Sequence, residues 1–402
     1  MAGRERRYEL PGIEDLTKEQ ERVLALPREG RHLIVGGPGT GKTTVCLLRA
    51  RRHARNRNDY VFLVWNHLLH RASRALFDGD LTAVTWKSWF WREFRRLVGK
   101  GVPTLGTDSG GWQPEDWSAV ARLLDDLPRS GNGTPGLPSL VIDEGQDMPP
   151  GFYDSLNSLG FENIFVAADQ NQQIKDENSS RRDLEELLVG QVVELTYNHR
   201  NSYPIARLAR AFYTGDPASP PPDLPPAAGT VYVPWLYRVD EAAMPRIARS
   251  ILRHWDQDPR RLIGVIAPKN TVREKYLREL QHACGVVPLD NGRPVVETFY
   301  GRHRPDVRFD EGGVLVINAQ ACKGLEFDTV VLADIDQHFV DAADLDRKRK
   351  LFYVMVSRAR QRVVMFMKKG GRQEIDEFLP ADENVLCRKD LTREEPIREE
   401  HA

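Results

Sequence analysis

Short apolar runs alternate with longer amphipathic stretches in the first half of the chain. The apolar runs lie at 31–37, 60–65, 82–86, 140–144 and 163–169, and the stretch 43–56 has helical spacing. Continuous apolar runs of this length are typical of strands that are buried on both faces. The pattern predicts alternating strands and helices, and therefore a parallel sheet covered by helices on both faces.

The second half of the chain repeats this pattern. Strands are expected at 230–236, 262–267, 314–319, 329–334 and 362–368, and helices near 239–256, 271–283 and 346–360. Residues 216–226 are proline-rich and are expected to form an extended loop. Residues 92–139 are rich in glycine and proline, with one short helical stretch near 115–126. The charged tail after Arg388 is expected to be loosely held.

Composition narrows the class of protein. A length of 402 residues suggests two or three domains. The net charge of -1 means that any nucleic-acid binding must come from a local patch. The four cysteines have no metal-binding spacing, so we expect reduced thiols in a cytoplasmic protein. The first residues lack the apolar core of a signal peptide, and no apolar run is long enough to span a bilayer.

The stretch GGPGTGKT, residues 36–43, fits the pattern G-x-x-x-x-G-K-[ST] and lies between a predicted strand and a predicted helix. Its glycines allow backbone N–H groups to surround phosphate oxygens at a helix N-terminus. Lys42 is expected to reach the β- and γ-phosphates of a nucleotide, and Thr43 to bind Mg²⁺. The residues expected to bind ATP here are Gly36, Gly37, Pro38, Gly39, Thr40, Gly41, Lys42, Thr43 and Thr44.

A second apolar run ends in acids. LVIDEGQD, residues 140–147, delivers Asp143 and Glu144 to the carboxyl edge of the sheet, where α/β proteins bind ligands. Asp143 is a candidate Mg²⁺ ligand, and Glu144 is a candidate base for the attacking water. An acidic loop or a helix cap is the alternative for this segment alone. The P-loop upstream favours the catalytic interpretation.

Two arginines in the second half follow predicted elements. They are Arg200 in LTYNHRNS and Arg358 in YVMVSRAR. A single arginine is more often a solvated surface residue, but a second lobe facing a nucleotide can supply cations to its γ-phosphate. A further polar cluster, AADQNQQIK (167–175), places Asp169 at a strand end and glutamines directly after it.

In this order, these blocks resemble the UvrD/Rep-like superfamily 1 helicases. Their motifs are matched by LTKEQ (16–20), GGPGTGKTT, VFLVWNHLLHRA (61–72), VTWKSWF (84–90), DEGQD, Asp169–Gln172, LTYNHR, KGLEFD (323–328) and LFYVMVSRAR (351–360). The resemblance implies two RecA-like α/β domains with one ATP site in the cleft between them. The expected division is 1–190, with a small insertion at 92–139, then 191–385, then a charged tail at 386–402.

The resemblance also implies roles for single residues. Gln20 and His199 would contact the adenine, and Glu326 the ribose or the rim of the cleft. Gln172 would couple the γ-phosphate to motion, and Arg200 and Arg358 would be arginine fingers. With Lys42 and Glu144, the last three complete the expected catalytic set, and ATP and Mg²⁺ are the expected cofactors.

Several positions depart from the family pattern. His199 stands where the family has a tyrosine that stacks on adenine. Residues 173–178 lack the aromatic stretch that grips DNA bases, although stacking is worth about 1–3 kcal/mol per base. Lys87 and Gln320 replace common histidines, and 92–139 and 201–313 leave little room for the family's large insertions. The motor is therefore expected to be complete, with few accessory parts for separating duplexes.

An aromatic and basic cluster at 86–96 is the candidate nucleic-acid surface. Core packing is the favoured interpretation for at least half of its aromatics; the alternative is that one or two stack on bases while arginines hold phosphates. The residues considered for contact with nucleic acid are Asn66, Thr85, Trp86, Lys87 and Trp89. The basic run at 347–350 begins a predicted helix, and a phosphate contact there is a weaker alternative.

Two functions remain open at this point. The first is an ATP-driven helicase or translocase on nucleic acid, with single-stranded DNA the expected partner and RNA a weaker option. The second is an ATP-dependent switch or effector subunit of a DNA repair or antiphage complex, which would act with a protein partner and without processive unwinding. No membrane partner is expected.

Overall fold

The computed structural model describes residues 15–65, 81, 83–106, 113–127, 136–169, 179–188, 190–215, 220–227, 232–299, 311–338, 344–370, 373–392, 395 and 397. Two of the candidate site residues, Asn66 and Gln172, lie outside these ranges, as does the polar stretch that follows Asp169. Among the described residues, no helix is both long and apolar enough to cross a membrane.

The first sheet is parallel throughout its described pairings. Its order is β3-β2-β4-β5-β1-β6, so β1 lies between β5 and β6. The strands in the described part of the chain are β1 (Arg31–Gly36), β2 (Tyr60–Val64), β3 (Ala83–Thr85), β4 (Ser139–Ile142), β5 (Ile164–Ala168) and β6 (Gln191–Leu195). Strands β2 and β5 are buried along their whole length, as continuous apolar runs predict.

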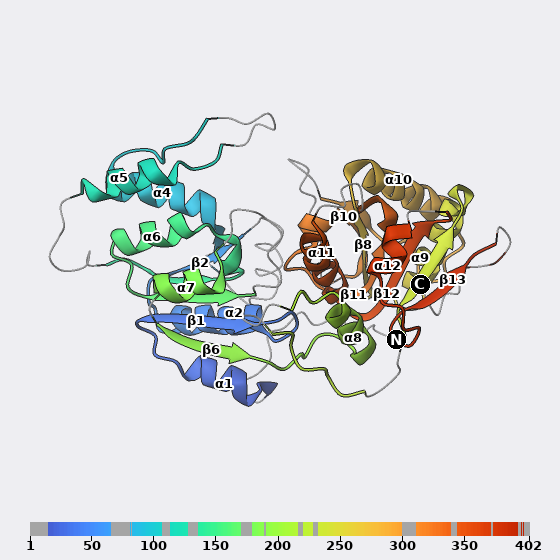
Figure 1. Ribbon diagram of the computed structural model, residues 1–402, viewed down its shortest axis with the longest axis horizontal. Coiled ribbons are helices and arrows are strands. Elements are labelled where there is room, and N and C mark those ends of the chain that lie inside the picture. Colours follow the sequence, from blue (N-terminus) through green and yellow to red (C-terminus); the bar gives the residue numbers. More distant parts are fainter. Residues whose placement is uncertain are drawn as a thin grey trace.

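Helices cover both faces of this sheet (Figure 1). One face carries α1 (Lys18–Ala25) and α2 (Lys42–Arg55). The other carries α4 (Trp86–Val98), α5 (Trp117–Asp125), α6 (Pro150–Ser158) and α7 (Arg181–Leu188). Helix α1 begins with a capping box, in which the Thr17 hydroxyl and the Gln20 side chain accept hydrogen bonds from each other's backbone N–H.

The second sheet is also parallel, in the order β13-β7-β12-β11-β8-β10-β9. Its described strands are β7 (Trp235–Val239), β8 (Leu262–Ala267), β9 (Val296–Thr298), β10 (Gly313–Asn318), β11 (Phe327–Leu332), β12 (Ala359–Lys368) and β13 (Cys387–Asp390). Helices α9 (Met244–Asp256) and α10 (Asn270–Val286) cover one face. Helices α8 (Tyr203–Ala211), α11 (Leu345–Ser357) and α12 (Gln373–Phe378) cover the other.

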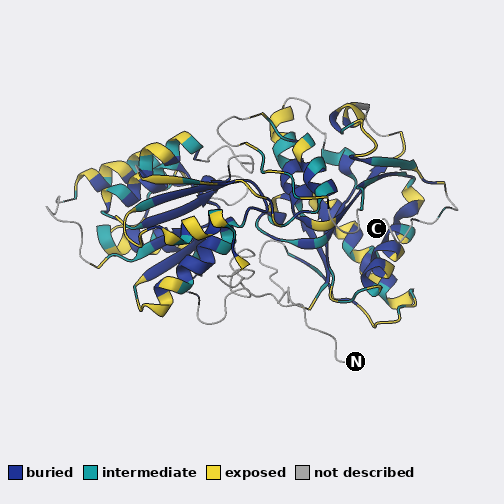
Figure 2. Cartoon of the chain, turned by 90° about the horizontal axis from the view of Figure 1, so that it is seen from below, coloured by how far each residue is buried: buried dark blue, intermediate teal, exposed yellow. Residues whose placement is uncertain are grey.

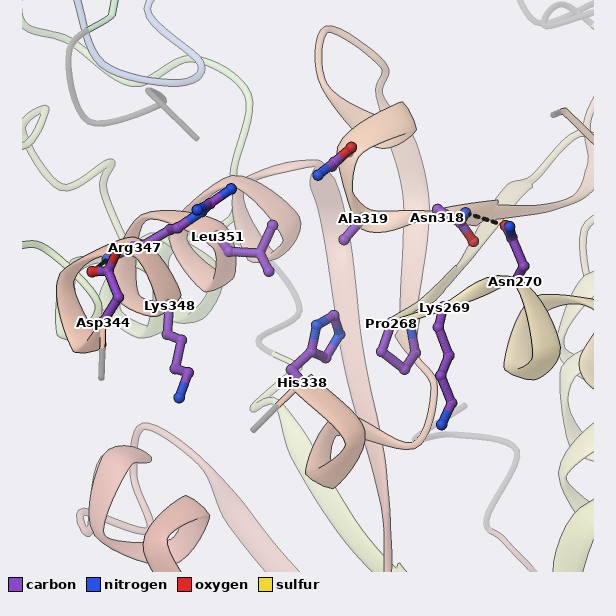
Figure 3. A pocket seen from close by; sticks show the side chains of 11 residues that line it. Pro268, Lys269, Asn270, Asn318, Ala319, His338, Asp344, Arg347, Lys348 and Leu351 are labelled. Atoms are coloured by element: carbon purple, nitrogen blue, oxygen red, sulfur yellow. Dashed lines mark hydrogen bonds between the residues drawn. The ribbon is translucent and has the colours of Figure 1, made fainter. Parts of the chain in front are cut away.

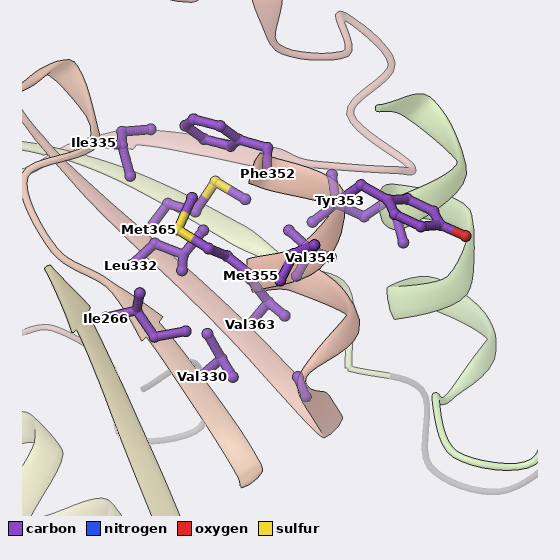
Figure 4. Close-up of a cluster of buried hydrophobic side chains, with 14 of the residues drawn as sticks. Ile266, Val330, Leu332, Ile335, Phe352, Tyr353, Val354, Met355, Val363 and Met365 are labelled. Carbon is purple, nitrogen blue, oxygen red and sulfur yellow. The ribbon is translucent and has the colours of Figure 1, made fainter. Parts of the chain in front are cut away.

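Each sheet has a hydrophobic core on both faces, and the buried residues follow the strands and the inner sides of the helices (Figure 2). In the second sheet, Phe352 and Val354 of α11 pack with Ile266, Val330 and Leu332 of the strands (Figure 4). Short 3-10 turns follow β4, β7, β10 and β11, at Gly145–Asp147, Glu241–Ala243, Ala319–Cys322 and Ile335–His338.

The expected α/β architecture with two parallel sheets is confirmed, while several bounds differ from the sequence prediction. Strand β6 pairs with β1, so the first sheet continues past residue 190. Strand β13 pairs with β7, so part of the expected tail belongs to the second sheet. Helix α4 continues to Val98, into the stretch expected to be rich in loops. Edge strands have weak periodicity, which explains why β6 and β13 were not foreseen.

Candidate nucleotide site

The P-loop joins β1 to α2, and two of its glycines adopt a backbone that other residues rarely adopt. Gly39 and Gly41 have φ of 79° and 90°. A Cβ on Gly39 would lie 2.2 Å from Asn198 Oδ1, and one on Gly37 would lie 2.5 Å from Pro222 Cδ. The glycines therefore serve both the turn and the close approach of the segments that connect the two sheets.

Lys42 lies at the centre of this loop. Its Nζ donates to the carbonyl oxygens of Gly36 and Gly37, each at 2.8 Å, and lies 3.4 Å from Asp169 Oδ2. The side chain is 7% exposed. The ammonium group is thus already placed where the loop N–H groups would surround a phosphate. The loop carbonyls and Asp169 hold it there without a nucleotide.

Thr43 and Asp143 meet directly, although 100 residues separate them in sequence. The Thr43 hydroxyl donates to Asp143 Oδ2 at 2.8 Å. A hydroxyl and a carboxylate are the oxygen ligands that Mg²⁺ prefers together with phosphates and water, so the donor set fits this cation. Burial and the neighbouring Glu144 carboxylate raise the pKa of Asp143 to about 7.

Glu144 occupies a strained position beside Asp143. Its φ of 56° is in the left-handed region, which is costly for a residue other than glycine and is typical of functional sites. Burial alone would raise the pKa of Glu144, but the charges of Lys323, Lys42 and Arg358 lower it overall. The carboxylate is therefore ionised and able to accept a proton.

Gln146 connects several parts of the site and was not foreseen as a site residue. It is fully buried. Its Nε2 donates to Glu144 Oε2 at 2.6 Å, and its Oε1 accepts from the Asp169 N–H at 2.9 Å. Its backbone oxygen accepts from the Ser179 N–H at 3.1 Å. Gln146 therefore holds Glu144 and both described ends of the segment that carries Gln172. Its position within the motif DEGQD was the sequence signal that could have identified Gln146 as a site residue.

The two candidate arginine fingers, Arg200 and Arg358, come from the part of the chain that follows β6. Arg200 Nη2 donates to Glu326 Oε1, and Arg360 Nε donates to Glu326 Oε2 at 3.2 Å. Burial alone would raise the pKa of Glu326, but Arg200 and Arg360 hold it at about 2. Arg358 is 1% exposed and donates from Nε to Val354 O at 3.1 Å. The structure brings Glu326 to Arg200, and Arg360 joins them without having been predicted.

The side of the P-loop toward α1 contains the residues expected to contact a base. Gln20 Nε2 donates to Thr40 O at 3.3 Å, and the His199 N–H donates to Gly39 O at 2.8 Å. The Tyr197 and His199 rings lie 4.4 Å apart, and Tyr197 is 36% exposed. Tyr197 and His199 are two positions apart in an extended segment, so their side chains lie on the same face of that segment. Tyr197 is thus a second aromatic group at this place, which sequence reasoning missed.

The cluster at 86–96 is mainly core. Trp86 and Trp89 are 4% and 2% exposed and pack edge-on against Phe152. This burial contradicts a stacking role for these two tryptophans. Lys87 Nζ pairs with Glu115 Oε1 at 2.8 Å, and the Thr85 hydroxyl donates to Ser88 Oγ at 2.9 Å. Core packing, the interpretation favoured from the sequence, accounts for both indoles.

A cavity of about 510 Å³, lined by both polar and apolar side chains, lies at the carboxyl edge of the second sheet (Figure 3). His338 faces it from one side and Asn318 from the other. Buried polar atoms of both side chains, His338 Nε2 and Asn318 Oδ1, have no hydrogen-bond partner among the residues that the structure describes. Burial lowers the pKa of His338 to about 4, so its imidazole is neutral near pH 7. Cationic side chains at the cavity are Lys269, Arg347 and Lys348.

The first sheet carries a P-loop and an acidic pair at its edge, and a second parallel sheet follows it in the chain. This arrangement defines a P-loop protein built from two RecA-like domains. Residues 313–366 match the family model of the UvrD-like helicase C-terminal domain, and this segment contains KGLEFD and runs from β10 into β12. This segment of the chain is therefore similar to the C-terminal domain of UvrD-like helicases.

Solved structures are similar at a distance. The C-terminal domain of a possible DNA helicase from Lactobacillus plantarum WCFS1 aligns with 14% identity and a TM-score of 0.33, covering 47% of this chain and 97% of that one. Arterivirus nonstructural protein 10, a helicase in complex with DNA, aligns with 14% identity and a TM-score of 0.36, covering 87% of this chain and 62% of that one. By sequence, no curated protein matches the chain. The similarity to UvrD-like helicases therefore rests on residues 313–366.

Proposed function

We propose that this chain hydrolyses ATP and couples hydrolysis to movement along nucleic acid, with single-stranded DNA the expected strand. The observation that carries the proposal is the meeting of Thr43 with Asp143 at 2.8 Å, directly beside Lys42 and Glu144. These are the parts that phosphoryl transfer needs: a phosphate cradle, oxygen ligands for a cation and a base.

In this proposal, each residue has a separate role in the reaction. Lys42 and the loop N–H groups bind the phosphates, and Thr43 and Asp143 hold Mg²⁺, which neutralises charge on the phosphate oxygens when it is bound. Glu144 accepts the proton of the attacking water. Arg358 and Arg200 neutralise the γ-phosphate, and Arg200 leaves Glu326 to do so. The adenine lies between Gln20 and the rings of Tyr197 and His199. Gln172 is proposed to sense the γ-phosphate.

The nucleic-acid strand is proposed to cross the cavity of the second sheet. Its mixture of cations, amides and an imidazole suits phosphates and base edges. Two buried polar atoms, on His338 and Asn318, have no partner in the described part of the chain, and this favours a polar ligand in the cavity. This surface replaces the tryptophans of α4 as the candidate contact with bases.

Hydrolysis itself is tested with Glu144→Gln and Lys42→Ala. We expect the first to reduce kcat by about 10²–10⁴-fold, because it removes the general base, while ATP still binds. The second should weaken binding of ATP as well. Glu241→Gln is the matched control, because Glu241 pairs with Lys368 on the exposed surface away from this site. Equal hydrolysis by wild type and Glu144→Gln would contradict the proposal.

A second candidate function is an ATP-dependent switch in a repair or defence complex without processive unwinding. The burial of Trp86 and Trp89 favours it, because it leaves fewer aromatic side chains to grip a strand. A strand-displacement assay separates the two functions: hydrolysis that rises with single strands while no duplex is opened, and that rises further with a partner protein, supports the switch.

A further inference from the structure

An ion pair joins the two sheets at the nucleotide site. Lys323 Nζ lies 2.6 Å from Asp147 Oδ1, and the side chains are 7% and 5% exposed. Asp147 ends the 3-10 turn that follows Glu144, and Lys323 begins KGLEFD directly before β11. The two residues are 176 positions apart, so the pair forms only when the sheets are together.

A buried pair of this kind contributes little to stability as such. Removing two charges from water is costly, and their mutual attraction often only balances that cost. Apolar residues of similar volume usually serve the fold equally well. What an ion pair adds is a directional contact whose members regain their hydration when the sheets separate. Such a contact is suited to an interface that opens and closes.

Against the effect of burial, the charge of Lys323 lowers the pKa of Glu144 directly, and the pair is also linked to Glu144 through Gln146. Asp147 follows Gln146, whose Nε2 donates to Glu144 Oε2 at 2.6 Å. The same side chain accepts from the Asp169 N–H at 2.9 Å. A displacement of Asp147 therefore moves the 3-10 turn that carries Gln146, and with it the orientation of the Glu144 carboxylate.

We propose that Lys323 is a positioning residue that fastens the second sheet to Asp147 and thereby sets the orientation of Glu144. The inference rests on the proposed hydrolysis of ATP and goes beyond it, because it gives Lys323 a role in orienting Glu144 through its ion pair with Asp147. Closure of the two sheets would then also align the Glu144 carboxylate.

The first test separates positioning from stability. Lys323→Met should lower kcat by about tenfold or more while KM for ATP changes by less than about threefold, since binding does not use Lys323. Lys323→Arg should restore much of the rate. The double variant Asp147→Leu with Lys323→Met should unfold at the wild-type temperature or above it and still show the low kcat. A double variant with wild-type kcat would overturn the proposal.

Arg238→Met is the matched control, because Arg238 Nη2 also lies 2.6 Å from a carboxylate, Asp376, but within the second domain. We expect its kcat to equal that of wild type. Loss of kcat in this variant to the same extent as in Lys323→Met would contradict a special role for Lys323.

The second test needs no activity. Small-angle scattering without nucleotide should show a larger radius of gyration for Lys323→Met than for wild type and for Lys323→Arg. An unchanged radius would overturn the proposal. Wild-type protein that hydrolyses no ATP would contradict the proposed function instead, and the scattering result would still decide whether Lys323 fastens the sheets.

Discussion

At the scale of the residue, sequence spacing was sufficient wherever the chemistry lies within one short segment. Lys42 and Thr43 could be proposed as site residues because a single loop contains all the parts expected of a phosphate cradle. Gln146 could not be assigned, because its role depends on Asp169, 23 residues away in the chain. The contact between Arg200 and Glu326 spans 126 residues and depends on the meeting of two segments for which the sequence has no local signal.

Glu326 permits a prediction about pH at this scale. Because its pKa of about 2 lies below the ordinary value of 4.5, its ionised form stabilises the fold above about pH 5, and this contribution is lost as pH falls from 4.5 toward 2. Glu326→Gln should therefore reduce stability by about 2 kcal/mol at pH 7, allowing for partial exposure.

The measurement is the unfolding temperature of Glu326→Gln and wild type between pH 7 and pH 3. The difference between the two proteins should shrink as pH falls. Glu241→Gln, which removes an exposed partner of Lys368, should unfold like wild type at each pH. A difference between Glu326→Gln and wild type that stays constant down to pH 3 would contradict the role given to Arg200 and Arg360.

At the scale of the element, buried strands were predictable and edges were not. Strands β5 and β8 are apolar along their length, and the sequence located both within a residue. Strand β6 is mostly exposed, and only its pairing with β1 makes it a strand. The cavity beside α11 was also unpredictable as a site, because it brings together residues from four separate segments.

The start of α11 carries the next prediction. Arg347 lines the cavity and is exposed. Arg347→Met should weaken binding of a single-stranded oligonucleotide several-fold and reduce the slope of log K against log salt by about 0.7, as expected for one lost phosphate contact. Fluorescence anisotropy at several salt concentrations measures both. Lys368→Met, an exposed cation of the same domain, is the control. Equal losses in the two variants would point to general surface charge.

At the scale of the whole molecule, the repeated strand pattern predicted two parallel sheets, and the motifs assigned the catalytic parts to each. The relative placement of the sheets came only from the structure, through contacts such as Lys323 with Asp147 and Pro222 with Gly37. Because of these contacts, residues of both domains lie together at the candidate nucleotide site. An opening between the sheets would separate Glu144, the proposed base, from Lys323 and Arg358, whose charges lower its pKa against the effect of burial.

The central claim is that nucleic acid controls ATP hydrolysis by this chain. The most direct test is the steady-state hydrolysis rate of the wild-type protein with single-stranded DNA, duplex DNA, RNA or no polymer. We predict a clear increase with single-stranded DNA, absent in Glu144→Gln. The same rate under all four conditions would contradict the claim.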